Sequence, residues 1–244
     1  MRARRLVAVA SVAVGLVALS GCRSEPGVAA YVGDHRITED AVTEVIDDAR
    51  AKNPEPAEPV PGQQQVRLPG RGEVVSTLVL GQVCERISAA EGYRPQGQAE
   101  AAQVAQQLGI SPEATYARQV AELYTCLSGI PVGSPVAPTE QELADLVAAG
   151  KRAGAVPADV TVEQAAPQLD GEQLRQALAT RDALAGAVET YDVTVNPRYR
   201  PLEFPVLSFA GQAVAVGVPL GEPGSDAVTD VSTPRPAQTG PVDG

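Results

Sequence analysis

The stretch Val28-Ala29-Ala30-Tyr31-Val32-Gly33-Asp34-His35-Arg36-Ile37-Thr38-Glu39-Asp40 combines a strand, a turn and the start of a helix. The apolar run over residues 28–32 predicts a strand, and the Gly-Asp pair after it predicts a turn. Thr38 stands where a helix N-cap belongs, and the two acidic residues that follow favour the positive end of a helix dipole. An apolar stripe at helical spacing continues from there, so we expect a helix that ends before Pro54.

Helical patterns dominate the chain beyond this stretch. Apolar residues at helical spacing predict helices over 73–91, over 97–108 and from Ser111 to Gly129. Capping patterns predict three further helices, which begin after Thr139, Thr161 and Asp170. Extended segments are expected at 191–195, 202–209 and 212–218. We therefore predict a mainly α fold with a minor β component.

Proline and glycine mark the connections between these elements. Residues 53–72 form a Pro-rich loop, which we interpret as a linker in preference to a poly-Pro recognition segment, and residues 131–138 form a second linker. From Gly221 onward, large apolar residues nearly vanish. We therefore place one domain at 28–209 and expect a tail at 210–244 that is first extended and then disordered.

The N-terminal residues have the pattern of a secretory signal peptide. Three arginines precede an apolar run from Leu6 to Leu19, which as a helix reaches only about 21 Å, short of the roughly 30 Å hydrocarbon core of a bilayer. The sequence Leu19-Ser20-Gly21-Cys22 resembles a bacterial lipobox, the motif in which the cysteine is diacylated. We expect residues 1–21 to be the signal peptide and 22–27 a tether that Cys22 anchors to the extracytoplasmic face of the cell membrane. The alternative is an ordinary secreted protein with a cysteine there by chance.

The charge of the chain excludes some classes of partner. The 244 residues carry a formal charge of −11, which becomes −14 when residues 1–21 and their three arginines are removed. Such an acidic surface repels nucleic acid and anionic headgroups, so the lipid must hold the protein at the membrane. Tryptophan is absent and phenylalanine occurs twice, so an aromatic-lined site for a small-molecule substrate is not expected.

Two cysteines remain once Cys22 is assigned to lipidation. Cys84 and Cys126 form an even pair in an exported protein, which predicts one disulfide. They fall late in two different predicted helices, so a bridge would join one helix to the other. The alternative of two buried free thiols stays open.

The sequence offers little for catalysis. The single histidine, His35, follows the Gly33-Asp34 turn and lacks the partners of a metal site, so we interpret it as a surface residue. The acidic pairs Glu39-Asp40 and Asp47-Asp48 fall on helix faces where carboxylates are normally solvated. No phosphate-binding loop, G-x-S-x-G or H-E-x-x-H pattern occurs, and nothing favours an acid-pair glycosidase. We expect no enzymatic activity, no cofactor and no metal.

Residues 29–40 resemble the opening strand, turn and helix of the SurA/PrsA/trigger-factor-like chaperones. Residues 75–92 are similar to the next apolar helix of that family, and Pro138-Thr139-Glu140-Gln141-Glu142-Leu143 resembles the start of a later helix. Residues 191–199 resemble the returning C-terminal strand, in particular that of actinobacterial lipoprotein members. The resemblance spans about residues 28–209.

The resemblance implies a SurA N-terminal-like helical domain, closed by a small sheet that pairs the first strand with the returning strand. It also implies a concave surface that binds unfolded or newly exported polypeptides. Many relatives insert a parvulin-type prolyl isomerase domain, but residues 139–190 carry a helical pattern here, so isomerase activity is not expected. No client-binding residue can be assigned. The alternative is a binding lipoprotein, either an assembly subunit of an envelope complex or, ranked below it, a solute receptor.

Overall fold

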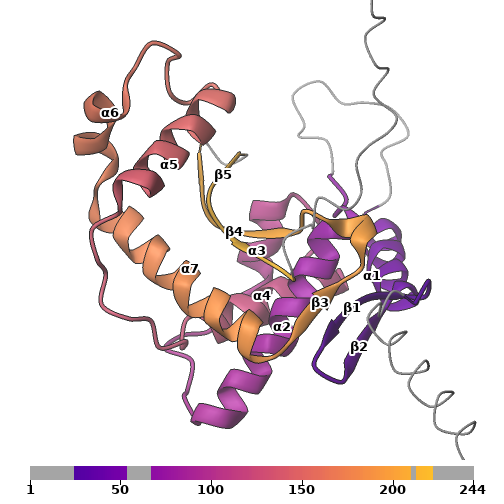
Figure 1. Ribbon diagram of the computed structural model, residues 1–244. Helices are drawn as coiled ribbons and strands as arrows, with labels where there is room; N and C mark the ends of the chain where they lie inside the picture. Colours follow the sequence, from indigo (N-terminus) through magenta and orange to yellow (C-terminus); the bar gives the residue numbers. More distant parts are fainter. Residues whose placement is uncertain (1–24, 54–66, 210–212, 222–244) are drawn as a thin grey trace, which may run out of the picture.

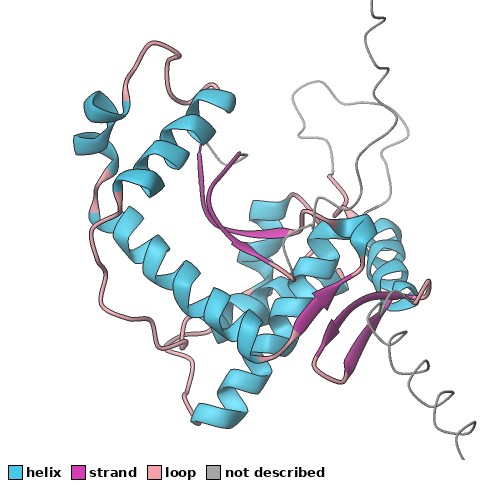
Figure 2. Cartoon of the chain, viewed as in Figure 1, coloured by secondary structure: helices cyan, strands magenta, loops and turns pink. Residues whose placement is uncertain are grey.

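A computed structural model of the chain describes residues 25–53, 67–209 and 213–221 (Figure 1). Helices make up most of these residues, and the strands form two small antiparallel sheets (Figure 2). The predicted mainly α fold with a minor β component is confirmed. In chain order the elements are β1 (Val28–Val32), β2 (His35–Thr38), α1 (Glu39–Lys52), α2 (Arg71–Glu91), α3 (Ala101–Leu108), α4 (Thr115–Leu127), α5 (Glu140–Arg152), α6 (Val162–Leu169), α7 (Glu172–Thr190), β3 (Val193–Val195), the 3-10 helix η1 (Pro197–Tyr199), β4 (Glu203–Phe209) and β5 (Ala213–Pro219).

The first sheet joins the two ends of the helical region. Its strand order is β2-β1-β3, with β1 in the centre and both neighbours antiparallel to it. Ala30 pairs with Val195, and Val32 pairs with Val193. All five residues of β1 are buried, which is why its sequence is a continuous apolar run without polar alternation.

Strand β2 was not predicted. We expected residues 35–37 to connect the turn to the helix, but residues 35–38 pair with β1. Only Ile37 of this strand is buried, so its sequence lacks the apolar alternation that marks a strand. The predicted strand at 191–195 begins only at Val193, because Asp192 has a φ of 49° and cannot continue an extended chain.

Helix α2 is the centre of the main core. It contacts α1, α4, α7, β1, β2 and β4, and nine of its residues are buried. The largest fully buried side chains of this core include Leu80, Leu123 and Leu184, which come from α2, α4 and α7. A helix that is apolar around most of its circumference has to lie inside the fold, as the sequence of α2 predicted.

Two predicted helix N-caps, Ser111 and Asp170, do not cap their helices. Helix α4 begins at Thr115, not at Ser111, and its first backbone N–H donates to Asp48 of α1 at 2.6 Å. Asp170 does not cap α7, because its carboxylate accepts two hydrogen bonds from Arg175, at 2.8 and 3.0 Å. The N-cap of α7 is Gly171.

Three other helix boundaries test the capping patterns directly. Thr38, Thr139 and Thr161 each accept a hydrogen bond from a backbone N–H in the first turn of their helices, as predicted. The helix predicted over 97–108 begins only at Ala101, but it ends at Gly109, whose φ of 70° is the left-handed conformation expected after a helix.

Helices α5, α6 and α7 and the hairpin of β4 and β5 form the other end of the molecule. Figure 1 shows α5 and α6 at the end opposite β1 and β2, with α7 leading from one end to the other. A second, smaller core lies here, made of Leu146, Leu174, Ala177, Leu178 and Val216. Val206 of β4 packs against both cores and so connects them.

The packed part of the chain extends beyond residue 209, where we placed the end of the domain. Strand β5 pairs with β4 along its length, and Val216, Val218 and Leu220 are buried. Residues 210–212 and 222–244 lie outside the described residues, so the predicted disorder of the tail falls there.

A group of polar side chains ties α1, α2 and η1 together. The carboxylate of Glu39 accepts hydrogen bonds from Arg71 at 2.5 Å and from the hydroxyl of Tyr199 at 2.7 Å. Burial raises the pKa of Glu39, but the hydrogen bonds from Tyr199 and Arg71 outweigh it, so the pKa lies below its ordinary value. This group holds the segment after β3 against the start of the first helix.

Candidate functional site

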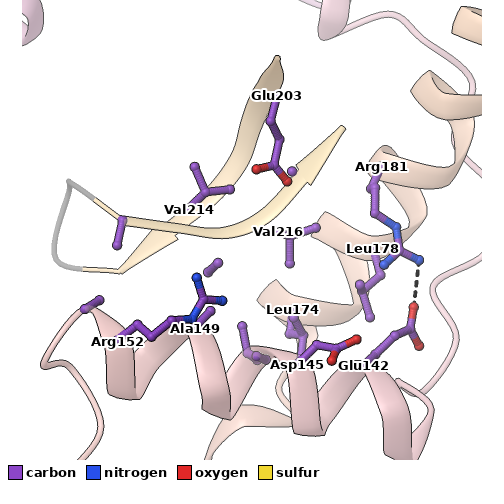
Figure 3. Close-up of a pocket in the computed structure, with 15 residues that line it drawn as sticks. Glu142, Asp145, Ala149, Arg152, Leu174, Leu178, Arg181, Glu203, Val214 and Val216 are labelled. Carbon is purple, nitrogen blue, oxygen red and sulfur yellow. Dashed lines mark hydrogen bonds and ion pairs between the residues drawn. The ribbon is translucent and has the colours of Figure 1, made fainter. Parts of the chain in front are cut away.

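An open groove lies between α5, α7 and the β4–β5 hairpin (Figure 3). Its volume of about 490 Å³ lies within the range of ordinary ligand pockets. Helix α5 forms one wall, and Leu174, Leu178 and Arg181 of α7 form a second. Five consecutive residues of β5, Ala213 to Gly217, form the third. We call this hollow the α5–β5 groove.

The α5 wall is a stripe along one face of that helix. The stripe follows helical spacing and contains charged and apolar positions, so a ligand lying along it meets both kinds of surface. Leu146 of the stripe is buried in the second core, whereas Ala149 is half-buried at the groove surface. The members of the stripe are Glu142, Asp145, Leu146, Ala149, Arg152 and Ala153.

One charged pair is fixed at the end of the groove where α5 faces α7. Arg181 donates to Glu142 at 2.6 Å and to the neighbouring Asp182 at 2.6 Å (Figure 3). The hydrogen bond from the backbone N–H of Thr139, followed by that from Arg181, lowers the pKa of Glu142 below its ordinary value. The predicted N-cap of α5 therefore also positions the groove carboxylate.

Two other charges in the groove have no such partner. Within the described ranges, neither Arg152 of α5 nor Glu203 of β4 has a hydrogen bond or an ion pair. The side chain of Glu203 lies against Gly217, where a Cβ atom would collide with it. Both residues are exposed.

A bulge changes the direction of the side chains along β5. Val216 pairs with Leu207 and Val214 pairs with Ser208, which leaves Ala215 without a partner on β4. Figure 3 shows Val214 and Val216 pointing to opposite sides of the strand. Bulges of this kind are frequent beside binding sites, where they redirect a side chain.

The predicted disulfide is present. Cys84 of α2 is bonded to Cys126 of α4, with 6.2 Å between their Cα atoms. The hydroxyl of Tyr93 lies 3.2 Å from the sulfur of Cys84 and 3.1 Å from that of Cys126. The bridge joins two helices of the main core and lies away from the α5–β5 groove.

The remaining predicted residues do not gather into a site. His35 is exposed on β2, and the described residues hold no group of three or more His, Cys, Asp or Glu side chains that could bind a metal ion. Cys22 lies outside the described residues. The search for membrane spans, made on the described residues, found no helix with the length and apolarity to cross a bilayer.

Two smaller hollows lie elsewhere on the described surface. One, of about 390 Å³, lies between α3 and α4, and the other, of about 240 Å³, lies between α2 and α7. Neither combines charges of both signs with an open strand, so the α5–β5 groove is the better candidate site.

Sequence reasoning did not identify the α5–β5 groove. Its walls come from elements that are separated in the chain, and nothing in the sequence of any one of them shows that they meet. The only local signal was the capping pattern at Thr139, which placed Glu142 in the first turn of α5. Comparisons with protein-family models, with curated proteins and with solved structures found no match.

Proposed function

We propose that this protein is a lipid-anchored, extracytoplasmic, chaperone-like protein without prolyl isomerase activity. On this proposal, the α5–β5 groove binds segments of unfolded or newly exported polypeptides. The observation that carries the proposal is the groove itself, which is open and offers apolar and charged surfaces side by side. Such a surface accepts many different peptide segments, as a chaperone must.

The strand pairing supports the resemblance on which the family assignment rests. A SurA N-terminal-like domain is expected to close by pairing its first strand with its returning strand, and β1 pairs with β3 here. Residues 139–190, where many relatives carry the isomerase, contain α5, α6 and α7. We therefore propose a domain of this type in which the groove takes the place of an enzymatic site.

The structure beside the predicted tether supports a close attachment to the membrane. The backbone oxygens of Glu25, Pro26 and Gly27 each accept a hydrogen bond from the folded body. Only Arg23 and Ser24 separate these residues from Cys22, so a lipid on Cys22 holds the body within about 10 Å of the bilayer surface. Helix α5, which forms one wall of the α5–β5 groove, lies at the end of the molecule opposite β1 (Figure 1).

An aggregation assay tests the proposal. A client diluted from denaturant should aggregate less in the presence of the protein at a near-stoichiometric ratio. Ala149→Trp should abolish this effect because Ala149 lines the groove. The matched control is Ala148→Trp, which adds the same side chain to the exposed neighbouring position. A wild-type protein that protects none of several clients would contradict the proposal.

The alternative, an assembly subunit of an envelope complex, predicts a different result. A stable partner at fixed stoichiometry should then accompany the protein through purification in mild detergent, and Ala149→Trp should leave aggregation of clients unaffected. That pair of results would replace the chaperone proposal.

A further inference from the structure

The two sulfurs of the disulfide differ in their accessibility. Cys84 is 1% exposed, whereas Cys126 is half-buried. Cys126 also lines the hollow of about 390 Å³ between α3 and α4, and Cys84 does not. A group that enters this hollow therefore reaches the disulfide at Cys126.

The hydroxyl of Tyr93 is fixed beside both sulfurs. It lies 3.2 Å from the sulfur of Cys84 and 3.1 Å from that of Cys126, whereas the hydroxyl of Ser88 lies 3.8 Å from Cys126. The ring of Tyr93 packs closely on Gly129, where an added Cβ would lie 2.7 Å from it. A hydroxyl binds a thiolate more strongly than a neutral sulfur. Tyr93 is therefore placed to stabilise the charge that appears when the S–S bond breaks.

The position of each cysteine in its helix decides which sulfur should carry that charge. Cys126 is the residue before the last of α4, so a thiolate there would lie at the negative end of the helix dipole. Cys84 lies in the interior of α2, away from that end. Burial opposes a thiolate at Cys84, and the hydroxyl of Tyr93 offsets this cost. Attack at Cys126 with Cys84 as the leaving group agrees with both the accessibility and the charge.

The chain on one side of the hollow is irregular and exposed. Residues 92–100 connect α2 to α3 without a helix or strand, and most of them are exposed. A hydrogen bond of 2.9 Å from the backbone N–H of Ala99 to the hydroxyl of Thr125 joins this segment to α4. An extended polypeptide can therefore approach the hollow over this segment.

The charges around the hollow favour a thiol with basic neighbours. Glu100 and Glu122 line it, together with Arg118. The guanidinium group of Arg118 already donates to the backbone oxygen of Glu113 and to the hydroxyl of Thr115. The two carboxylates attract a basic polypeptide and repel an acidic thiol such as glutathione.

We infer that the Cys84–Cys126 disulfide undergoes thiol–disulfide exchange with a cysteine of an unfolded polypeptide, through attack at Cys126. The incoming thiolate forms a bond to the sulfur of Cys126, the Cys84–Cys126 bond breaks, and its electron pair stays on Cys84, where Tyr93 hydrogen-bonds the new thiolate. The number of disulfides does not change, so the step consumes no oxidant or reductant. This activity is separate from binding in the α5–β5 groove.

Trapping the mixed disulfide tests the direction of attack. The full chain with Cys22→Ser, which has no third cysteine, is mixed with the acetylated, amidated peptide Gly-Lys-Cys-Lys-Gly, quenched with acid at early times and alkylated. Mass mapping should find the peptide on Cys126 and the alkyl group on Cys84, at a rate proportional to the thiolate concentration. Glutathione at equal thiolate concentration should react more slowly. A mixed disulfide on Cys84, equal amounts on both cysteines, or reaction only as fast as the protein unfolds would overturn the inference. Faster reaction of glutathione would overturn its assignment to a polypeptide thiol.

Tyr93→Phe separates stabilisation of the leaving group from simple covering of the disulfide. The variant keeps the ring against Gly129 and loses the hydroxyl, so exchange should slow about tenfold. Tyr124→Phe is the matched control, because Tyr124 lies on the exposed side of α4 and should leave the rate unchanged. If Tyr93 only shields the disulfide, Tyr93→Phe should accelerate exchange. An accelerated or unchanged rate would therefore contradict the role given to Tyr93.

Discussion

Cys84 and Cys126 join two helices of the main core, and the hydroxyl of Tyr93 lies against both sulfurs. Replacing both cysteines with serine should lower the free energy of unfolding by roughly 4 kcal/mol, because the bridge closes a loop of 42 residues in the unfolded chain. Denaturant unfolding of the variant and of the wild type, without reducing agent, measures the difference. An unchanged unfolding midpoint would contradict the expected stabilisation.

Glu39 provides a pH-dependent contribution to stability. Its folded pKa lies below the value of 4.5 of an ordinary glutamate, so its contribution is complete above that pH and is lost as pH falls through the folded pKa. Glu39→Gln should lower the free energy of unfolding by about 1–2 kcal/mol at neutral pH, because charged hydrogen bonds to Arg71 and Tyr199 are weakened. Unfolding midpoints measured between about pH 6 and about pH 3 should fall less steeply for the variant than for the wild type. Parallel curves would show that Glu39 does not carry this dependence.

The sequence predicted the disulfide but not the hydrogen bonds around Glu39. The disulfide followed from counting cysteines in a chain predicted to be exported. The group around Glu39 did not, because Arg71 and Tyr199 come from separate segments. The sequence predicted that Glu39 is solvated on a helix face, yet only 14% of its side chain is exposed.

The N-caps of α5 and α6 offer a matched pair of variants. Thr139→Ala and Thr161→Ala each remove a capping box and should each lower the free energy of unfolding by about 1 kcal/mol. Only Thr139→Ala should also weaken peptide binding, because the hydroxyl of Thr139 donates to the carboxylate of Glu142 in the α5–β5 groove at 2.8 Å, whereas α6 contributes no lining residue. Thermal unfolding and anisotropy titrations measure the two effects. Equal binding by both variants would show that the cap does not position the groove.

Elements with local signals could be predicted, and those specified by tertiary contacts could not. The helices capped by Thr38, Thr139 and Thr161 begin where the sequence placed them. Helix α4 does not, because Asp48 of α1 accepts the hydrogen bond of its first backbone N–H. Strand β2 was missed for a similar reason, since pairing with β1 specifies it and its own residue pattern does not.

At the scale of the whole molecule, the pairing of the first and returning strands followed from the resemblance, but the α5–β5 groove could not be foreseen. Its three walls come from α5, α7 and β5, and their approach depends on how the second core packs around Val216. Apolar periodicity shows which face of each helix is buried. It does not show which elements leave a space between them.

The proposed attachment to the membrane can be tested on the whole protein. If Cys22 carries two acyl chains as proposed, the native protein should stay in the membrane fraction at high salt, because acyl chains and not charge would hold it there. Cys22→Ser should be found in the soluble fraction with its unfolding midpoint unchanged, since the change removes the proposed lipid and alters no residue of the buried cores. Release of the wild type by salt alone would contradict lipid anchoring.

The central claim is that unfolded polypeptide occupies the α5–β5 groove, and site-specific photo-crosslinking measures this directly. A photoreactive amino acid is placed at Ala149 inside the groove or at the exposed Ala148 outside it, and each variant is irradiated with an unfolded client and with the same client folded. We predict a crosslinked product from position 149 with the unfolded client, and little from position 148 or with the folded client. Equal yields at the two positions, or equal yields with folded and unfolded client, would contradict the claim.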